Sequence, residues 1–240
     1  MRQILFVGAC EKSDLLLYSS ALLAAAGKKV LLIDATTEQK LKYSVPRIDG
    51  DGDMTEYEGF YVSYGLKTGA EVRTYLEHVR FDGLLLAEAG FDTILIDTNH
   101  REFFEGISIQ DYTERVYVTN YEKSCIHVNE EILQSVLPKQ SGYTPFIPII
   151  KDTVDCQINT EYFEKMLGHH PIAWSGEFYE IEFDELDYAS RIDNQNHNRL
   201  RLNRLSKAYQ RTLIDVTTEI SGMTYAEMKS AFKRIKKGRH

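Results

Sequence analysis

Lys12 and Ser13 are the residues whose types and spacing most directly indicate chemistry. In a phosphate-binding loop, a lysine reaches the phosphates and the next hydroxyl holds Mg²⁺. Their segment, 8–14, follows a short apolar run and precedes a helical pattern, a layout that directs backbone N–H groups and a helix N-terminus at a phosphate. We therefore predict a nucleotide site that includes Gly8, Glu11, Lys12, Ser13 and Asp14.

Two carboxylates, those of Asp34 and Asp97, close predicted strands. The carboxyl ends of parallel strands border the ligand crevice of open α/β sheets, so we expect both side chains near the loop. If a nucleotide binds, the expected Mg²⁺ ligands are Ser13, Asp34 and Asp97.

Simpler roles for these residues stay open. Asp34 and Asp97 also suit solvated strand ends or caps, and Ser13 suits a helix N-cap with Asp14 in the first turn. Glu11 beside a lysine suits an exposed ion pair.

The composition narrows the class of protein. The 240 residues, 43% of them hydrophobic, suffice for one large domain or at most two small ones. A formal net charge of −8 argues against general nucleic-acid binding. The three cysteines are too few and too scattered for a disulfide framework, and no apolar run approaches the roughly 18 residues of a membrane-spanning helix. We expect a cytoplasmic protein.

Short apolar runs alternate with helical patterns, which predicts a doubly wound α/β fold whose mostly parallel sheet is flanked by helices. The predicted strands are 4–7, 30–33, 60–64, 91–97, 116–119, 145–150 and 177–183. The predicted helices are 13–26, 69–80, 124–137, 161–167, 185–193, 200–221 and 224–237. Pro145 and Pro148 place their strand at an edge or a strand end, and the stretch 38–59, with Asp49, Asp51 and Asp53, is an exposed loop.

Three segments together carry a resemblance to a known family. The loop with Lys12, the run 28–34 (KKVLLID) and the run 91–98 (FDTILIDT) resemble the MinD/ParA class of deviant-Walker P-loop ATPases. The pattern of that class is KGGxGKTT, a helix, GKKVLLIDxD and later FDxIIIDxPxG. Segment 180–184, followed by a helix, is more weakly similar to the penultimate segment of the family. The resemblance implies ATP and Mg²⁺ as ligands and face-to-face dimers.

The sequence departs from this pattern at Val7, Ala9, Glu11, Asp14, Thr36, Asn99 and Arg101. Val7 replaces the lysine that crosses to the other subunit's nucleotide, and Thr36 replaces an aspartate that positions the attacking water. Glu11 replaces a glycine and brings a negative charge close to the phosphates. Because phosphoryl transfer depends on positioned charge, we expect the fold to be kept and hydrolysis to be lost.

The resemblance and the departures together imply a non-hydrolysing MinD/ParA-like factor that positions or assembles cell-envelope machinery. Within the family, the degeneracy of the loop is similar to the TadZ/CpaE-like pilus-assembly group, whose members often have atypical phosphate loops. A homodimer, or a protein partner in an assembly machine, is the expected association. Two alternatives stay open: an active ATPase that switches between monomer and dimer, and a DNA-partitioning protein, which the acidic composition disfavours.

The C-terminal segment differs in composition from the rest. We predict a MinD/ParA-like domain over 1–222 and a basic amphipathic helix or tail over 223–240. Its apolar stripe, spaced by three and four residues, is Tyr225, Met228, Phe232 and Ile235. Its basic residues are Lys229, Lys233, Arg234, Lys236, Lys237 and Arg239. Such a helix either packs on the body or binds the inner face of an anionic membrane, as the targeting helix of MinD-like proteins does.

Two short segments offer residue types that bind metals: Cys125 with His127, and His169 with His170. Their spacing matches no zinc motif, so we interpret them as a buried cysteine and surface histidines.

Overall fold

The computed structural model describes residues 1–46, 54–137 and 142–237. The central strands of its main sheet are β1 (Arg2–Val7), β2 (Val30–Asp34), β7 (Thr93–Thr98) and β8 (Glu114–Thr119). The flanking strands are β3 (Thr55–Tyr57), β4 (Phe60–Ser63), β9 (Thr144–Thr153), β10 (Ile172–Trp174) and β11 (Tyr179–Glu182). A separate hairpin joins β5 (Arg80–Phe81) to β6 (Leu84–Leu85).

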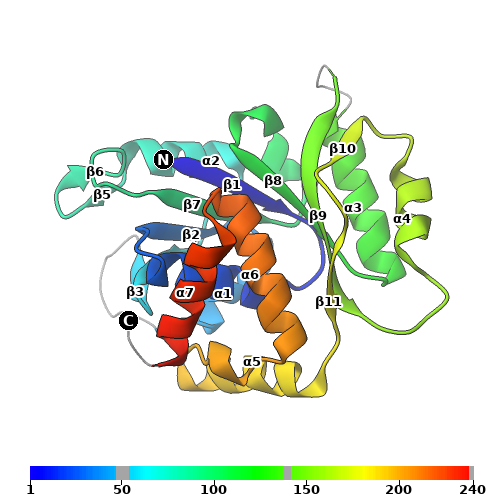
Figure 1. Ribbon diagram of the computed structural model, residues 1–240. Coiled ribbons are helices and arrows are strands. Elements are labelled where there is room, and N and C mark those ends of the chain that lie inside the picture. The colour runs from blue at the N-terminus through cyan, green and yellow to red at the C-terminus, as the bar shows by residue number, and fades with distance from the viewer. Residues whose placement is uncertain (47–53, 138–141, 238–240) are drawn as a thin grey trace.

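The strand order is β10-β9-β8-β1-β7-β2-β4-β3, with β11 also beside β9, and all the pairings are parallel except that of β3 with β4 (Figure 1). The helices of the described residues are α1 (Ser13–Ala25), α2 (Gly69–His78), α3 (Lys123–Val136), α4 (Thr160–Leu167), α5 (Glu185–His197), α6 (Lys207–Ser221) and α7 (Tyr225–Lys236). The predicted doubly wound, mostly parallel sheet flanked by helices is confirmed.

Near-continuous apolar runs form the central strands because both faces of the sheet are covered. In β1, Ile4 and Phe6 join the core cluster that includes residues of α1, α6 and α7, whereas Leu5 and Val7 join the cluster that includes residues of α2 and α3. Figure 1 shows α1, α6 and α7 together on one side of the sheet. Because β1, β2 and β7 pair in parallel, their carboxyl ends lie at one edge of the sheet, where the loop before α1 lies.

The strand with two prolines lies inside the sheet, so the edge is wrong, whereas the other alternative, a strand end, holds for Pro145, the second residue of β9. β9 pairs with β8 on one side and with β10 and β11 on the other. The N–H of Thr144 donates to Pro171 on the β10 side. Because backbone groups alternate along an extended strand, the nitrogen of Pro148 faces the same side. It lies between the β10 pairing, which ends at Phe146, and the β11 pairing, which begins at Ile149. Pro145 precedes the β8 pairing, which begins at Ile147. Neither proline therefore interrupts a ladder.

Other boundaries shift for local reasons. α6 begins at Lys207 because the Ser206 side chain caps it by accepting the N–H of Tyr209, and a 3₁₀ turn occupies Leu202–Arg204. The expected loop 38–59 contains the 3₁₀ turn Lys40–Tyr43 and strand β3, and Asp49, Asp51 and Asp53 lie outside the described residues.

The apolar stripe of α7 packs on the body. Met228, Phe232 and Ile235 are buried in the core cluster that α1 and α6 share, and Tyr225 is exposed. In this packing, the three buried residues are not exposed to a membrane. Of the two alternatives, the structure shows the helix packed on the body. The division at residue 222 remains a prediction. No helix among the described residues is long and apolar enough to cross a membrane.

Candidate nucleotide site

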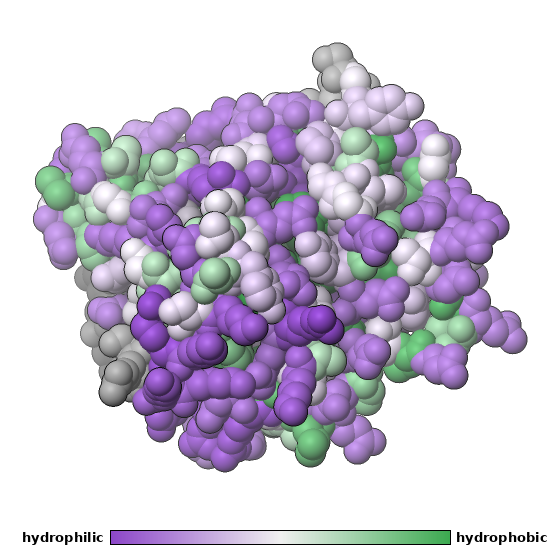
Figure 2. Space-filling view, viewed as in Figure 1, coloured by the Kyte–Doolittle hydropathy of each residue, from purple (hydrophilic) through white to green (hydrophobic). Residues whose placement is uncertain are grey.

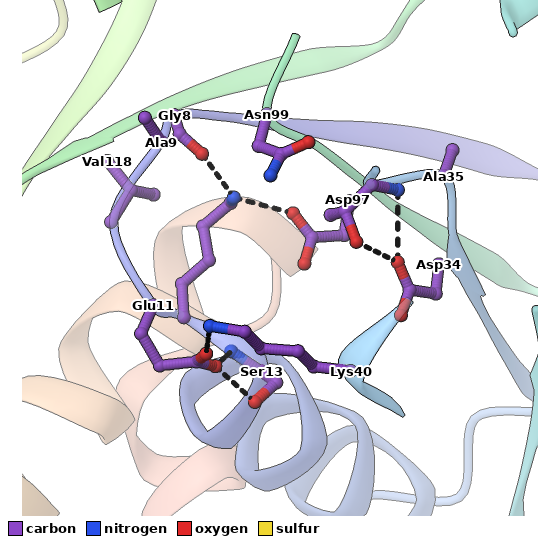
Figure 3. A network of polar contacts seen from close by, with 12 residues as sticks. Gly8, Ala9, Glu11, Ser13, Asp34, Ala35, Lys40, Asp97, Asn99 and Val118 are labelled. Atoms are coloured by element: carbon purple, nitrogen blue, oxygen red, sulfur yellow. Dashed lines mark hydrogen bonds and ion pairs between the residues drawn. The ribbon is translucent and has the colours of Figure 1, made fainter. Parts of the chain in front are cut away.

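The loop 8–12 joins β1 to α1 at the carboxyl edge of the sheet (Figure 3). Gly8 is required there, because a Cβ on it would lie 1.9 Å from the carbonyl oxygen of Val118. The N–H of Ala9 donates to Oδ1 of Asn129 at 2.7 Å, and Nδ2 of Asn129 donates to the Val118 carbonyl at 3.1 Å. A side chain of α3 thus occupies a backbone N–H of the kind that a phosphate-binding loop offers its ligand.

Lys12 is buried and has internal partners. Its Nζ donates to the Gly8 carbonyl at 2.5 Å and lies 2.7 Å from Oδ1 of Asp97. Burial alone would lower the pKa of Lys12, but the attraction of Asp97 raises that pKa above its ordinary value. Lys12 therefore stays charged and is held by Asp97, so it is not free to bind a phosphate.

Glu11 lies at the N-terminus of α1. Its Oε1 accepts the Ser13 N–H at 3.0 Å and also the Ser13 hydroxyl, and its Oε2 lies 2.6 Å from Nζ of Lys40 (Figure 3). Burial alone would raise the pKa of Glu11, but the bonds from Lys40 and Ser13 lower it to about 2. A carboxylate of the chain itself thus takes the bonds that a helix N-terminus offers to an anion.

These contacts correct two simpler roles. Glu11 and Lys12 do not form an exposed pair, because Glu11 pairs with Lys40 and Lys12 with Asp97. Ser13 is not the N-cap of α1 but its first helical residue.

Asp34 orders the turn that follows β2. Its Oδ1 accepts the N–H and the hydroxyl of Thr36 at 3.0 and 2.6 Å, and its Oδ2 accepts the N–H of Leu41 at 3.0 Å. Asp34 and Asp97 are only 1% and 3% exposed, so the role of solvated strand end is wrong for both. The turn that Asp34 orders carries Lys40 to Glu11.

The three predicted Mg²⁺ ligands do come together, since Ser13, Asp34 and Asp97 line one cavity. However, the Ser13 hydroxyl donates to Glu11, Asp34 holds its turn, and Asp97 faces Lys12. With their oxygen atoms engaged in this way, the residues do not fit a Mg²⁺ ion in this arrangement.

Asp14 has a structural partner. Its Oδ1 lies 3.1 Å from Nζ of Lys151, its Oδ2 accepts the Tyr209 hydroxyl at 3.0 Å, and the side chains of the ion pair are 6% and 1% exposed. This buried pair joins α1 to β9 and α6. Asp14 is therefore placed in the core, away from a ligand.

The space at the loop is small. The cavity bordered by Lys12, Asp34 and Asp97 has a volume of about 60 Å³, below the roughly 300–1,000 Å³ of ligand pockets. It adjoins a groove of about 530 Å³, whose charged lining residues are Glu11, Glu38, Lys40, Glu122, Asp152 and Arg191. Carboxylates outnumber cations there, which disfavours a polyphosphate. A cavity of about 680 Å³ lies elsewhere, beside α2, and its charged lining residues are Arg73, Glu77 and Asp111.

The sequence indicated which residues of the loop and strand ends would meet, but it missed their partners. Lys40, Asn129 and Lys151 complete the site, and no motif marks them. Only the folded arrangement brings Lys40 to Glu11, which lies 29 positions earlier.

The sheet order, the loop after β1 and the carboxylates near the carboxyl ends of β2 and β7 define a P-loop nucleoside-triphosphatase fold. Within that class, the fold is the one seen in MinD and ParA proteins. The chain matches the MinD cell division protein of Aquifex aeolicus with a TM-score of 0.64 and 16% identity, covering 93% of this chain and 98% of that one. A chain of the MinC:MinD cell division protein complex of the same organism gives a TM-score of 0.63.

Two further solved structures agree. A ParA family ATPase from Chlorobium tepidum TLS gives a TM-score of 0.61 at 14% identity over 90% of this chain and 97% of the other. MinD with Mg-ADP from Pyrococcus horikoshii OT3 gives a TM-score of 0.57 at 16% identity, over 91% of this chain and 95% of the other. No family model and no curated protein matches the chain. At these identities, the likeness is one of fold.

Proposed function

We propose that this protein is a MinD/ParA-like positioning or assembly factor that does not hydrolyse ATP. It works in the cytoplasm as a homodimer or with a protein partner, on cell-envelope machinery such as a pilus. The structure of MinD with MinC supports a partner of this kind. Since Val7 replaces the lysine that crosses between subunits, a dimer of this chain is held by ordinary surface burial and does not depend on ATP.

The observation that carries this proposal is the contact of Glu11 with Ser13 and Lys40. Through this contact, Glu11 accepts the hydrogen bonds of the helix N-terminal N–H, which would otherwise bind phosphate, and of the Ser13 hydroxyl, which would otherwise bind Mg²⁺. Lys12 is likewise engaged with Asp97. An ATPase needs these groups free for the γ-phosphate, where developing charge is stabilised.

A second candidate function, the ATP-driven switch, is favoured by the convergence of Lys12, Ser13, Asp34 and Asp97 at one cavity. MinD with Mg-ADP has the same fold, which keeps this candidate open.

Release of phosphate from ATP·Mg²⁺ separates the two candidates. We expect the wild-type rate to equal that of Lys12→Ala and of Ser13→Ala, because neither group is available to a nucleotide. A robust rate that both substitutions abolish, in proteins whose circular dichroism shows them folded, would establish the switch and overturn the proposal.

A further inference from the structure

Glu130 of α3 lies beside two histidines of the turn that follows α4. One ligand atom from each of Glu130, His169 and His170 lies within 4.8 Å of the other two. Nε2 of His169 is 3.5 Å from Oε1 of Glu130, and the imidazole centroids are 4.0 Å apart. The spacing of the histidines in the sequence gave no metal motif, because the third residue comes from a helix about forty positions earlier.

His170 is not a surface histidine as we had expected, since it is only 8% exposed. Its Nε2 is buried and has no hydrogen-bond partner among the described residues. A buried polar nitrogen without a partner is costly, and coordination of a cation by His170 would offset that cost.

Backbone hydrogen bonds fix the turn that carries the histidines. The N–H of His170 donates to Leu167 at 2.9 Å, and its carbonyl accepts from Ile172 at 2.8 Å. Pro171 accepts the N–H of Thr144 at 2.9 Å, which ties the turn to β9. The ligands therefore lie on backbone that is already positioned.

We propose that Glu130, His169 and His170 bind one divalent transition-metal ion, Zn²⁺ in the first place, that fastens α3 to the turn between α4 and β10. Two imidazoles with one carboxylate suit zinc, whereas Mg²⁺ and Ca²⁺ prefer oxygen ligands. Bonds of about 2.0–2.1 Å give a tetrahedron with edges of roughly 3.3 Å, close to the separation of His169 and Glu130. Solvent can supply the fourth ligand, since the His169 side chain is 56% exposed.

The proposed metal site is independent of the proposed function, although helix α3 contacts both the metal site and the loop 8–12. α3 also carries Asn129, which holds the N–H of Ala9. A metal ion at Glu130 would thus order the helix that fixes the phosphate-binding loop.

The test is a Zn²⁺ titration of the tag-free, chelator-treated protein by calorimetry, with thermal unfolding measured in parallel. We expect one ion per chain and a melting temperature that rises with Zn²⁺ concentration. Glu130→Gln and His169→Ala should each weaken binding by at least about tenfold and remove the thermal shift. Excess Mg²⁺ should not compete.

Two control variants exclude other ligands. His127→Ala removes an exposed histidine from the same helix, and Cys156→Ser removes the exposed thiol. Both should bind Zn²⁺ as the wild type does. Absence of saturable binding at 100-µM Zn²⁺, chosen as roughly a hundredfold above a micromolar Kd, would overturn the proposal. So would binding that survives both Glu130→Gln and His169→Ala.

Discussion

At the scale of single residues, the site depends on where Glu11 finds its partners. The Ser13 N–H, the Ser13 hydroxyl and Lys40 Nζ all point to one carboxylate. Each of these groups would favour any anion at the helix N-terminus, so the Glu11 side chain competes directly with a phosphate for them. The charge that we expect to disfavour ATP is thus also the charge that Ser13 and Lys40 contact within the fold.

Glu11→Gln should reveal this stabilisation. Because the pKa of Glu11 is lowered from 4.5 to about 2 in the fold, its contribution is present above pH 4.5 and is lost as the pH falls through about 2. We expect the substitution to lower the free energy of unfolding by about 1–3 kcal/mol at pH 7 and by less than half of that at pH 3. Urea unfolding at both pH values measures the difference, with the exposed Glu105→Gln as control. An equal loss at the two pH values would show that the charge is not the cause.

Lys151→Met tests the buried pair with Asp14. Removing one partner leaves the other charge buried, which costs about 3–5 kcal/mol, whereas replacing both by apolar residues is often neutral. Chemical denaturation should therefore show a large loss for Lys151→Met and substantial recovery in the double variant with Asp14→Leu. A loss below about 0.5 kcal/mol in the single variant would mean that the pair is not formed as described.

At the scale of elements, α7 shows how an amphipathic helix can be satisfied internally. A capping box of Thr224 and Glu227 begins it, and its apolar stripe meets α1 and α6. The basic residues Lys229, Lys233, Arg234, Lys236 and Lys237 are exposed, and Arg239 lies outside the described residues. Figure 2 shows hydrophilic residues over α5 and the C-terminal part of α7. The sequence pattern was the same for the packed and the membrane-bound alternatives, so only packing could distinguish them.

Phe232→Ala should destabilise the protein by about 3–5 kcal/mol, because this side chain is 4% exposed in the core. Lys233→Ala, exposed on the same helix, should change the free energy of unfolding by less than about 0.5 kcal/mol. Thermal or urea unfolding measures both, and sedimentation with anionic vesicles should show no binding by any of the proteins. Vesicle binding that Phe232→Ala abolishes without destabilisation would contradict the packed helix.

At the scale of the whole molecule, local sequence patterns predicted the alternation of strands and helices and the edge at which Lys12, Asp34 and Asp97 meet. They failed where the outcome depends on distant partners. Pro145 and Pro148 indicated an edge or a strand end, and the edge was wrong because the offset between β10 and β11, which accommodates Pro148, cannot be read from the sequence. Lys40, with no motif around it, reaches Glu11 only because Asp34 shapes the turn between them.

The molecule as a whole therefore combines the fold of MinD and ParA proteins with a loop after β1 whose polar groups have partners within the chain. Titration of ATP·Mg²⁺ into the wild type and Glu11→Gly, followed by calorimetry, tests this claim most directly, with Glu105→Gly as control. The account predicts ATP affinity at least about tenfold higher for Glu11→Gly than for the wild type and the control, the effect of removing one like-charge contact. Equal affinity in folded wild type and Glu11→Gly would contradict it.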